Sequence, residues 1–523
     1  MVFGFSYVGV IFLVMLFVPN IIWAKNQPED YDKYSKKENK ILLFFERTGE
    51  VLACSVVAFS GCNVRPRSIW LGWLILSLIL MILYECYWIR YFKSEKKMAD
   101  MYSSFAGFPV AGASLPVIVL LCLGIYACNI VIIVTSVILG IGHIGIHLVH
   151  RNEVLPRVKK SRARRIVKTI ILIPVILILL LLSVIIAFRN VNYYKCVIDT
   201  NKGIDEESYI DINGQKQFIT IRGRNKNAPV ILYLHGGPGS PDSFFAYNFT
   251  NEIIDEYTVV CWDQRGCGRT YVMNDDKENK TVSFDQALDD LNVLVDYLIK
   301  RFGQEKISIM CHSYGTVLGT VYALNHSEKI EVYIGIGQFV NADTSVEAAY
   351  KDALLKSRQE DDITALTAAY ENYKKDKNIE TYSKVAAEAS KFYKNKRERN
   401  IIFMAVTSHR LSSEDLIWYS KMTSLDAFKK YQKNLVDYMM TVDLSDNSVF
   451  PHYLRIPAYY ISGKCDANCA YDDMVLYSNV TGGSYDLIEG CGHNVQYDAP
   501  KEVARIIKDN LDFEIYAAKM GNN

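Results

Sequence analysis

The chain has 523 residues, enough for more than two domains, and 58 basic residues nearly balance 57 acidic ones. A net charge of +1 provides no global field that would attract nucleic acid, so we expect no nucleic-acid partner. Half of the residues are hydrophobic, and they are concentrated toward the N-terminus. The sequence therefore predicts a membrane region over 1–190 and a folded domain over 191–523.

Long apolar runs dominate the first region. A transmembrane helix needs about 20 mostly apolar residues. Three separate runs meet this length, at 2–24, 69–88 and 166–188. The run 105–149 has no charged residue and is about twice the necessary length, so it fits two helices joined near 127–129. These runs predict a multi-pass protein of the cell membrane, with the lipid bilayer as a partner.

The segment 41–64 is a weaker candidate because Glu46, Arg47 and Glu50 lie inside it. Each charge costs roughly 2.5–3.5 kcal/mol at the centre of a membrane helix. The three charges lie toward one end, so we still expect a span, which brings the total to six. A removable signal peptide is the alternative for 2–24, but the segment lacks a basic n-region, and a retained helix is favoured.

Basic loops suggest the orientation, because Lys and Arg gather on the cytoplasmic side. The segment 157–165, RVKKSRARR, has six basic residues and no acidic one, and 25–40 and 90–97 are also basic. With these loops inside, the N-terminus and the C-terminal domain both lie on the extracytoplasmic side. Arg65 and Arg67 would also lie outside, which counts against this arrangement.

Strand and helix patterns alternate in the second region. Two period-2 runs flank Asn213-Gly214, which predicts a hairpin. Further strands are expected in PVILYL, YTVVCW, KISIM, EVYIGIG and PAYYISG. An amphipathic helix should begin at a Ser283-x-x-Gln286 capping box and end at Gly303. Strands separated by such helices predict a mostly parallel sheet with helices on both faces.

The strand pattern disappears over about 341–447, which is rich in Ala, Lys, Glu and Tyr. This stretch predicts several helices inserted between two strands. In a parallel sheet, ligands bind at the carboxyl ends of the strands, which such an insertion would cover. We interpret it as a helical cap, with a purely structural insertion as the alternative.

Ser313 lies in the stretch MCHSYGT, directly after a predicted strand and before a predicted helix. A nucleophile elbow has the pattern Gly-x-Ser-x-Gly at such a turn. Gly315 satisfies the second glycine, whereas Cys311 replaces the first. Because cysteine is still small, we expect Cys311 to be buried behind the elbow as a packing residue with no chemical role.

Two further residues complete a candidate triad. A serine hydroxyl needs a base to take its proton and a carboxylate to hold that base. Asp466 and His493 each follow a predicted strand and occur in the order Ser, Asp, His. All three should therefore meet at one sheet edge. The glycine-rich turn HGGPG follows an earlier strand, and the backbone N–H groups of Gly237 and Tyr314 are the expected oxyanion-hole donors.

Together, HGGPGSP (235–241), WDQRGCGRT (262–270), the Ser313 elbow and GCGHN (490–494) resemble the proline iminopeptidase branch of the α/β hydrolases. The resemblance covers about 209–511. It implies an α/β-hydrolase fold with a helical cap and cleavage of an N-terminal residue, typically proline, from short peptides or amides. It assigns Ser313, Asp466 and His493 to the triad, and HGGPG to the oxyanion hole.

Other matches and departures concern residues around the triad. Asp263, Arg265 and Arg269 match the second motif of the branch, where we expect them to brace the active-site loops.

The substrate-binding residues are not identified by the sequence. Four cap glutamates are candidates for binding a substrate amine, although each could be a solvated helix charge: Glu347, Glu360, Glu371 and Glu388. Cys465 and Cys469 could form a disulfide, but two unpaired thiols are the favoured interpretation.

Three functions remain open from the sequence. The first is a membrane-anchored serine aminopeptidase acting on short peptides through an acyl-enzyme. The second is an esterase, lipase or amidase that uses the same triad on a small amide or ester. The third is a membrane sensor that has a hydrolase fold without turnover. The triad mechanism requires no metal or organic cofactor, and none is expected.

Overall fold

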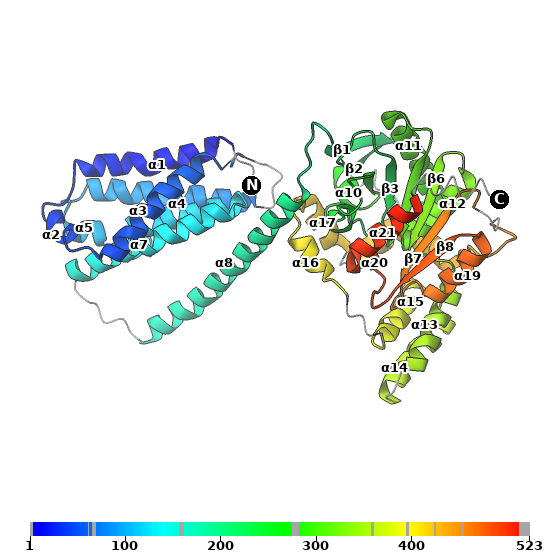
Figure 1. The fold of residues 1–523 in the computed structure, drawn as a ribbon. Helices are drawn as coiled ribbons and strands as arrows, with labels where there is room; N and C mark the ends of the chain where they lie inside the picture. The colour runs from blue at the N-terminus through cyan, green and yellow to red at the C-terminus, as the bar shows by residue number, and fades with distance from the viewer. Residues whose placement is uncertain are drawn as a thin grey trace. The chain divides into compact units, whose positions relative to one another are not determined.

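The computed structural model describes residues 4–60, 62–64, 70–155, 162–274, 282–356, 360–393, 397–422, 425–450 and 454–511. The chain folds into two compact units (Figure 1). The first comprises Met1–Lys195 together with Val406–Ser413, and the second comprises Cys196–Ala405 together with Glu414–Asn523.

The apolar runs of the first unit fold as helices. Its helices are α1 (Tyr7–Ala24), α2 (Tyr31–Ser35), α3 (Lys40–Ala58), α4 (Leu71–Phe92), α5 (Met98–Tyr102), α6 (Ala111–Tyr126), α7 (Ile130–Val154) and α8 (Arg162–Cys196). The long run 105–149 divides where predicted. Asn129 ends the junction as the N-cap of α7, and its side chain accepts hydrogen bonds from the N–H groups of Val131 and Ile132.

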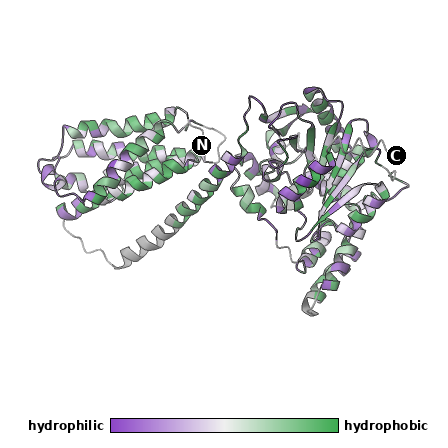
Figure 2. Ribbon diagram, in the orientation of Figure 1, coloured by the Kyte–Doolittle hydropathy of each residue, from purple (hydrophilic) through white to green (hydrophobic). Residues whose placement is uncertain are grey.

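Three of the described helices, α1, α4 and α7, are long and apolar enough to cross a membrane. Figure 2 shows them coloured mostly as hydrophobic. Helix α6 is apolar but has only 16 residues. The predicted span at 166–188 lies in α8, where the side chains of 162–176 and 179 are outside the described residues. The total of six spans therefore stays a prediction.

An eight-stranded mixed sheet forms the centre of the second unit (Figure 1). Its strands are β1 (Ile204–Ile212), β2 (Gln215–Gly223), β3 (Val230–Leu234), β4 (Thr258–Asp263), β5 (Ile307–His312), β6 (Ile330–Ile336), β7 (Ala458–Gly463) and β8 (Ser484–Ile488), in the order β1-β2-β4-β3-β5-β6-β7-β8. Strand β2 pairs antiparallel with β1 and β4, and the other pairs are parallel. The carboxyl ends of β3 to β8 consequently lie along one edge.

Local sequence signals determine where the hairpin turns and where α11 (Phe284–Phe302) begins and ends. Asn213 and Gly214 both have positive φ, 45° and 76°, as a two-residue hairpin turn requires. Short helices α9 (Tyr247–Thr250) and α10 (Gly268–Met273) precede α11, which ends at Gly303 with φ 62°. The Ser283 hydroxyl accepts a hydrogen bond from the N–H of Gln286.

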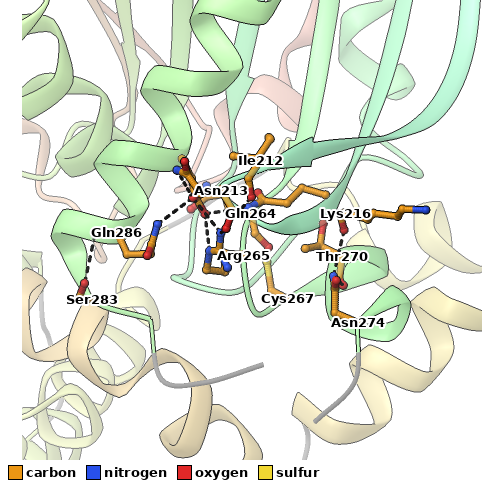
Figure 3. Close-up of polar contacts among 12 residues, drawn as sticks. Ile212, Asn213, Lys216, Gln264, Arg265, Cys267, Thr270, Asn274, Ser283 and Gln286 are labelled. Carbon is orange, nitrogen blue, oxygen red and sulfur yellow. Dashed lines mark hydrogen bonds and ion pairs between the residues drawn. The ribbon is translucent and has the colours of Figure 1, made fainter. Parts of the chain in front are cut away.

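Only half of the predicted capping box forms. The side chain of Gln286 donates to Asp290 Oδ1 at 3.0 Å instead of reaching back to the N-cap (Figure 3). Asp290 attracts it because the carboxylate is buried and also accepts bonds from Arg265 and Gln217. A tertiary network thus replaces the local bond that the sequence pattern predicted.

Six helices lie between β6 and β7, where the insertion was expected. They are α13 (Ala342–Lys356), α14 (Glu360–Lys375), α15 (Ile379–Ser390), α16 (Ile401–Val406), α17 (Ser413–Met422) and α18 (Leu425–Thr441). An isolated bridge between Asn341 and Asp443 joins the two ends of this cap. Helices α12 (Tyr314–Asn325), α19 (Tyr471–Thr481), α20 (Val495–Asp498) and α21 (Pro500–Leu511) complete the unit.

Candidate active site

Ser313 is the single residue between β5 and α12, as the elbow pattern predicted. Its backbone has φ 54° and ψ −125°, a conformation that residues with a side chain rarely adopt. Such a conformation costs on the order of 1–3 kcal/mol and is typical of functional sites. The sharp strand-to-helix turn of a nucleophile elbow has this kind of strain.

Close backbone packing explains the small residues around the elbow. A Cβ on Gly315 would lie 2.4 Å from the carbonyl oxygen of Leu234, and one on Gly236 would lie 2.8 Å from the Cβ of Ser313. The elbow and the HGGPG turn therefore contact each other through their glycines. Cys311 is fully buried, as expected, and its Sγ occupies the space where a Cβ on Gly319 would lie.

Asp466 and His493 meet at the ends of β7 and β8. His493 Nδ1 and Asp466 Oδ2 are 2.9 Å apart. The backbone N–H groups of Asn468 and Cys469 donate to the other carboxylate oxygen, Oδ1, at 2.8 and 2.9 Å. These bonds orient the carboxylate so that Oδ2 is directed at the imidazole, the arrangement that a triad requires.

The charge of Asp466 raises the pKa of His493. Burial lowers the pKa of the imidazole, but the adjacent carboxylate raises it by charge and by its hydrogen bond, and the net pKa lies above the ordinary value. The imidazolium that a general base forms when it accepts a proton is therefore stabilised in place.

The position of Ser313 relative to this pair is set by β6. The N–H of Ser313 donates to the carbonyl of Ile336 at 3.1 Å. A Cβ on the next residue, Gly337, would lie 3.3–3.4 Å from Asp466 Oδ2 and the His493 ring. Among the described residues no hydrogen bond joins the Ser313 hydroxyl to His493, and such bonds often tighten only when substrate binds.

Two neighbours of the site were not identified from the sequence. His312 donates from Nε2 to the carbonyl of His493 at 3.0 Å, and burial lowers the pKa of His312 to about 3, so its ring is neutral. The Cys469 thiol interacts with the Ser313 side chain, and burial raises its pKa well above the ordinary value. Cys465 and Cys469 are both free thiols, in agreement with the favoured interpretation.

The two backbone N–H groups predicted for the oxyanion hole belong to the HGGPG turn and the elbow. Gly237 has φ 118°, a value that only glycine adopts readily, and it precedes a cis bond to Pro238. In the part of the chain that the structure describes, the backbone N–H groups of Gly237 and Tyr314 have no hydrogen-bond partner. Tyr314 also begins α12, so its N–H belongs to the positive end of a helix.

The second motif joins several loops and strands of the unit. Arg269 donates to both oxygens of Asp415 on α17, at 3.0 and 2.9 Å, and to Glu207 of β1 at 3.0 Å. Asp263 Oδ2 accepts a bond from the N–H of Arg269 at 2.9 Å. Arg265 binds Asp290 and lies beside the hairpin turn (Figure 3). These residues hold loops together, as expected.

Cap helices also contact the glycine turn directly. The indole Nε1 of Trp418 donates to the carbonyl of Gly239 at 3.0 Å, and the Tyr419 hydroxyl donates to that of Pro241 at 2.7 Å. Gln432 of α18 donates to the carbonyl of Gly266 at 2.9 Å. The cap thereby fixes both glycine-rich loops against the sheet edge.

The candidate amine-binding glutamates have other partners. Glu347, Glu371 and Glu388 each form an ion pair with a lysine three or four residues later. Glu347 and Glu371 are exposed and fit the alternative of solvated helix charges, whereas Glu388 is partly buried. The side chain of Glu360 lies outside the described residues.

A family model of the alpha/beta hydrolase fold matches residues 229–500, just over half of the chain. The chain therefore belongs to the α/β hydrolases. Proteins named as proline iminopeptidases are among its relatives, all at low sequence identity.

Three relatives show how low the sequence identity is. The Bacillus subtilis protein named "Probable aminopeptidase YbaC" is 29% identical over 30% of this chain, and the match spans 48% of that relative, about half its length. A proline iminopeptidase of Saccharolobus solfataricus is 23% identical over 60% of this chain and 94% of its own. The crystal structure of a proline iminopeptidase-related protein from Thermus thermophilus has 19% identity and a TM-score of 0.42, covering 59% of this chain and 98% of that one.

Proposed function

We propose that the chain is a membrane-anchored serine hydrolase with Ser313 as nucleophile, His493 as general base and Asp466 as the carboxylate that holds His493. The observation that carries this proposal is the 2.9 Å contact between His493 and Asp466 at the sheet edge where Ser313 occupies a strained elbow. Membership in the α/β hydrolases supports the same roles.

The reaction follows from these positions. His493 Nε2 removes the proton of Ser313 Oγ as the oxygen attacks the substrate carbonyl carbon. The N–H groups of Gly237 and Tyr314 stabilise the oxyanion of the tetrahedral intermediate. The imidazolium then donates its proton to the leaving amine or alcohol, and an acyl-enzyme remains. Water, deprotonated by His493, releases the acid and restores Ser313.

For the substrate, we propose a short peptide from which an N-terminal residue is removed. The support is the resemblance of four motifs to the proline iminopeptidase branch and the similarity to proteins named as proline iminopeptidases. Purified full-length protein is expected to hydrolyse prolyl-β-naphthylamide faster than naphthylamides of other amino acids. Initial rates across this panel and a panel of p-nitrophenyl esters measure the preference.

The two panels separate the proposal from its alternatives. Turnover of esters without cleavage of any aminoacyl amide would replace the aminopeptidase by an esterase. An acetylated prolyl-naphthylamide serves as the matched control, because it blocks the free amine and leaves the scissile bond unchanged. Equal rates on the free and acetylated amides would contradict recognition of the N-terminus.

We also propose that the hydrolase domain lies outside the cytoplasm. The basic segment 157–165, which overlaps the start of α8, supports this orientation. Protease added to intact cells is expected to remove a C-terminal epitope tag, whereas a cytoplasmic marker protein stays uncut. Loss of the tag only after permeabilisation would place the domain inside and reverse the proposed topology.

A further inference from the structure

Three ionisable side chains gather within the first unit. They are Glu46 of α3 and His143 and His147 of α7, and one ligand atom from each lies within 4.8 Å of the others. The candidate triad belongs to the other unit. The hydrolase mechanism therefore has no use for this cluster.

Close packing of two helices creates the cluster. Helices α3 and α7 lie side by side (Figure 1). A Cβ on Gly142 would lie 2.2 Å from the backbone nitrogen of Glu46, and one on Gly49 would lie 2.5 Å from the backbone of Leu139. Glycines let two helices approach backbone to backbone. The crossing therefore fixes Glu46 directly beside the residue that follows Gly142, which is His143.

The two histidines share a face of α7 because they are four residues apart. Their ring centroids are 4.5 Å apart. Glu46 Oε1 lies 2.6 Å from His143 Nδ1, and only 8% of the Glu46 residue is exposed. Helix α7 is apolar enough to span a membrane. Ionisable side chains inside a membrane cost free energy and usually have a function.

The set of donors fits one class of ligand. Two imidazoles and a carboxylate are the protein ligands of open Zn²⁺ sites, where a fourth position holds water or substrate. Ligand atoms around such an ion are roughly 3–3.5 Å apart, given bonds of about 2.0–2.2 Å. Atoms that already lie within 4.8 Å reach this separation through small side-chain rotations.

A second layer of polar contacts continues along α7. The Tyr102 hydroxyl and His150 Nδ1 are 2.9 Å apart, and His150 Nε2 lies 3.6 Å from Glu38 Oε1. The Tyr102 ring also packs edge-on against His147, with centroids 5.5 Å apart. His150 is thus engaged by other partners, while the Tyr102 ring packs against the ring of His147.

We propose that Glu46, His143 and His147 bind a divalent transition-metal ion, with Zn²⁺ as the ion they fit best. Each imidazole donates a nitrogen lone pair and Glu46 a carboxylate oxygen. The ion replaces the contact between Glu46 and His143, and each imidazole presents to the ion a nitrogen that carries no proton.

The test uses the full-length protein in detergent. After treatment with a chelator, one sample receives Zn²⁺ and is passed through gel filtration, and its metal content is measured by mass spectrometry. Wild-type protein is expected to retain one Zn²⁺ per chain. Glu46→Gln and the double variant His143→Ala/His147→Ala are expected to retain less than about a tenth of that amount, since removing ligands costs most of the affinity.

Matched controls make the result decisive. Glu50→Gln changes the same residue type one turn further along α3, where the glutamate is exposed and pairs with Arg47, and it should retain Zn²⁺ like wild type. A monodisperse elution peak and unchanged helical circular dichroism show that each variant is folded. Substoichiometric Zn²⁺ in wild type, or equal retention by Glu46→Gln and Glu50→Gln, would overturn the proposal.

Discussion

Replacing Ser313 with alanine is expected to abolish covalent labelling by a fluorophosphonate and to lower kcat by about a millionfold, as loss of the nucleophile does in a serine protease. The expectation rests on the proposed roles, because Ser313 occupies the strained elbow at the sheet edge where His493 and Asp466 meet. Labelling is read by in-gel fluorescence, and kcat is measured on the best substrate of the panels.

The matched control is Ser308→Ala, which makes the same change five residues earlier, on the strand β5 that leads to Ser313. Its labelling and kcat should stay near wild type. The thermal unfolding midpoint should change little in Ser313→Ala, because alanine keeps the backbone and removes one hydroxyl. A folded Ser313→Ala protein that still labels and turns over would exclude Ser313 as the nucleophile. Failure of folded wild-type protein to label would favour a non-catalytic sensor.

Much of the site follows from the order of strands and turns in the sequence. Parallel strands place their carboxyl ends at one edge, so residues that directly follow strands converge without knowledge of packing. This rule alone places Asp466 beside His493. The strained turn at Ser313 was also predictable, since a strand and a helix leave one residue between them and Gly315 permits the close approach.

The remaining contacts depend on tertiary structure that has no local pattern. The Arg269–Asp415 pair joins residues 146 positions apart, and nothing near Asp415 marks it as the partner. Gln286 bonds to Asp290 because a buried network lies there, which overrides the local cap. The histidine spacing on α7 is visible in the sequence, whereas the position of Glu46 beside it depends on how α3 crosses α7.

Replacing Asp466 with asparagine is expected to lower kcat by about ten thousandfold, because the amide no longer holds His493 in the required tautomer. The same change should move the acidic limb of the pH–rate profile to lower pH. In wild type the rate rises as His493 loses its proton, at a pKa that the carboxylate holds above the ordinary value. Without the carboxylate, burial remains and lowers that pKa, so the neutral imidazole forms at lower pH.

The combination of a large loss in kcat and an acidic shift distinguishes this role from simple destabilisation, which would lower the rate and leave the pKa in place. Asp473→Asn is the matched control, since Asp473 is also buried but accepts its hydrogen bond from Thr344 at 2.8 Å. It should change kcat by no more than a few-fold and leave the profile unmoved. An Asp466→Asn profile that keeps the wild-type limb would show that another group sets the pKa of the general base.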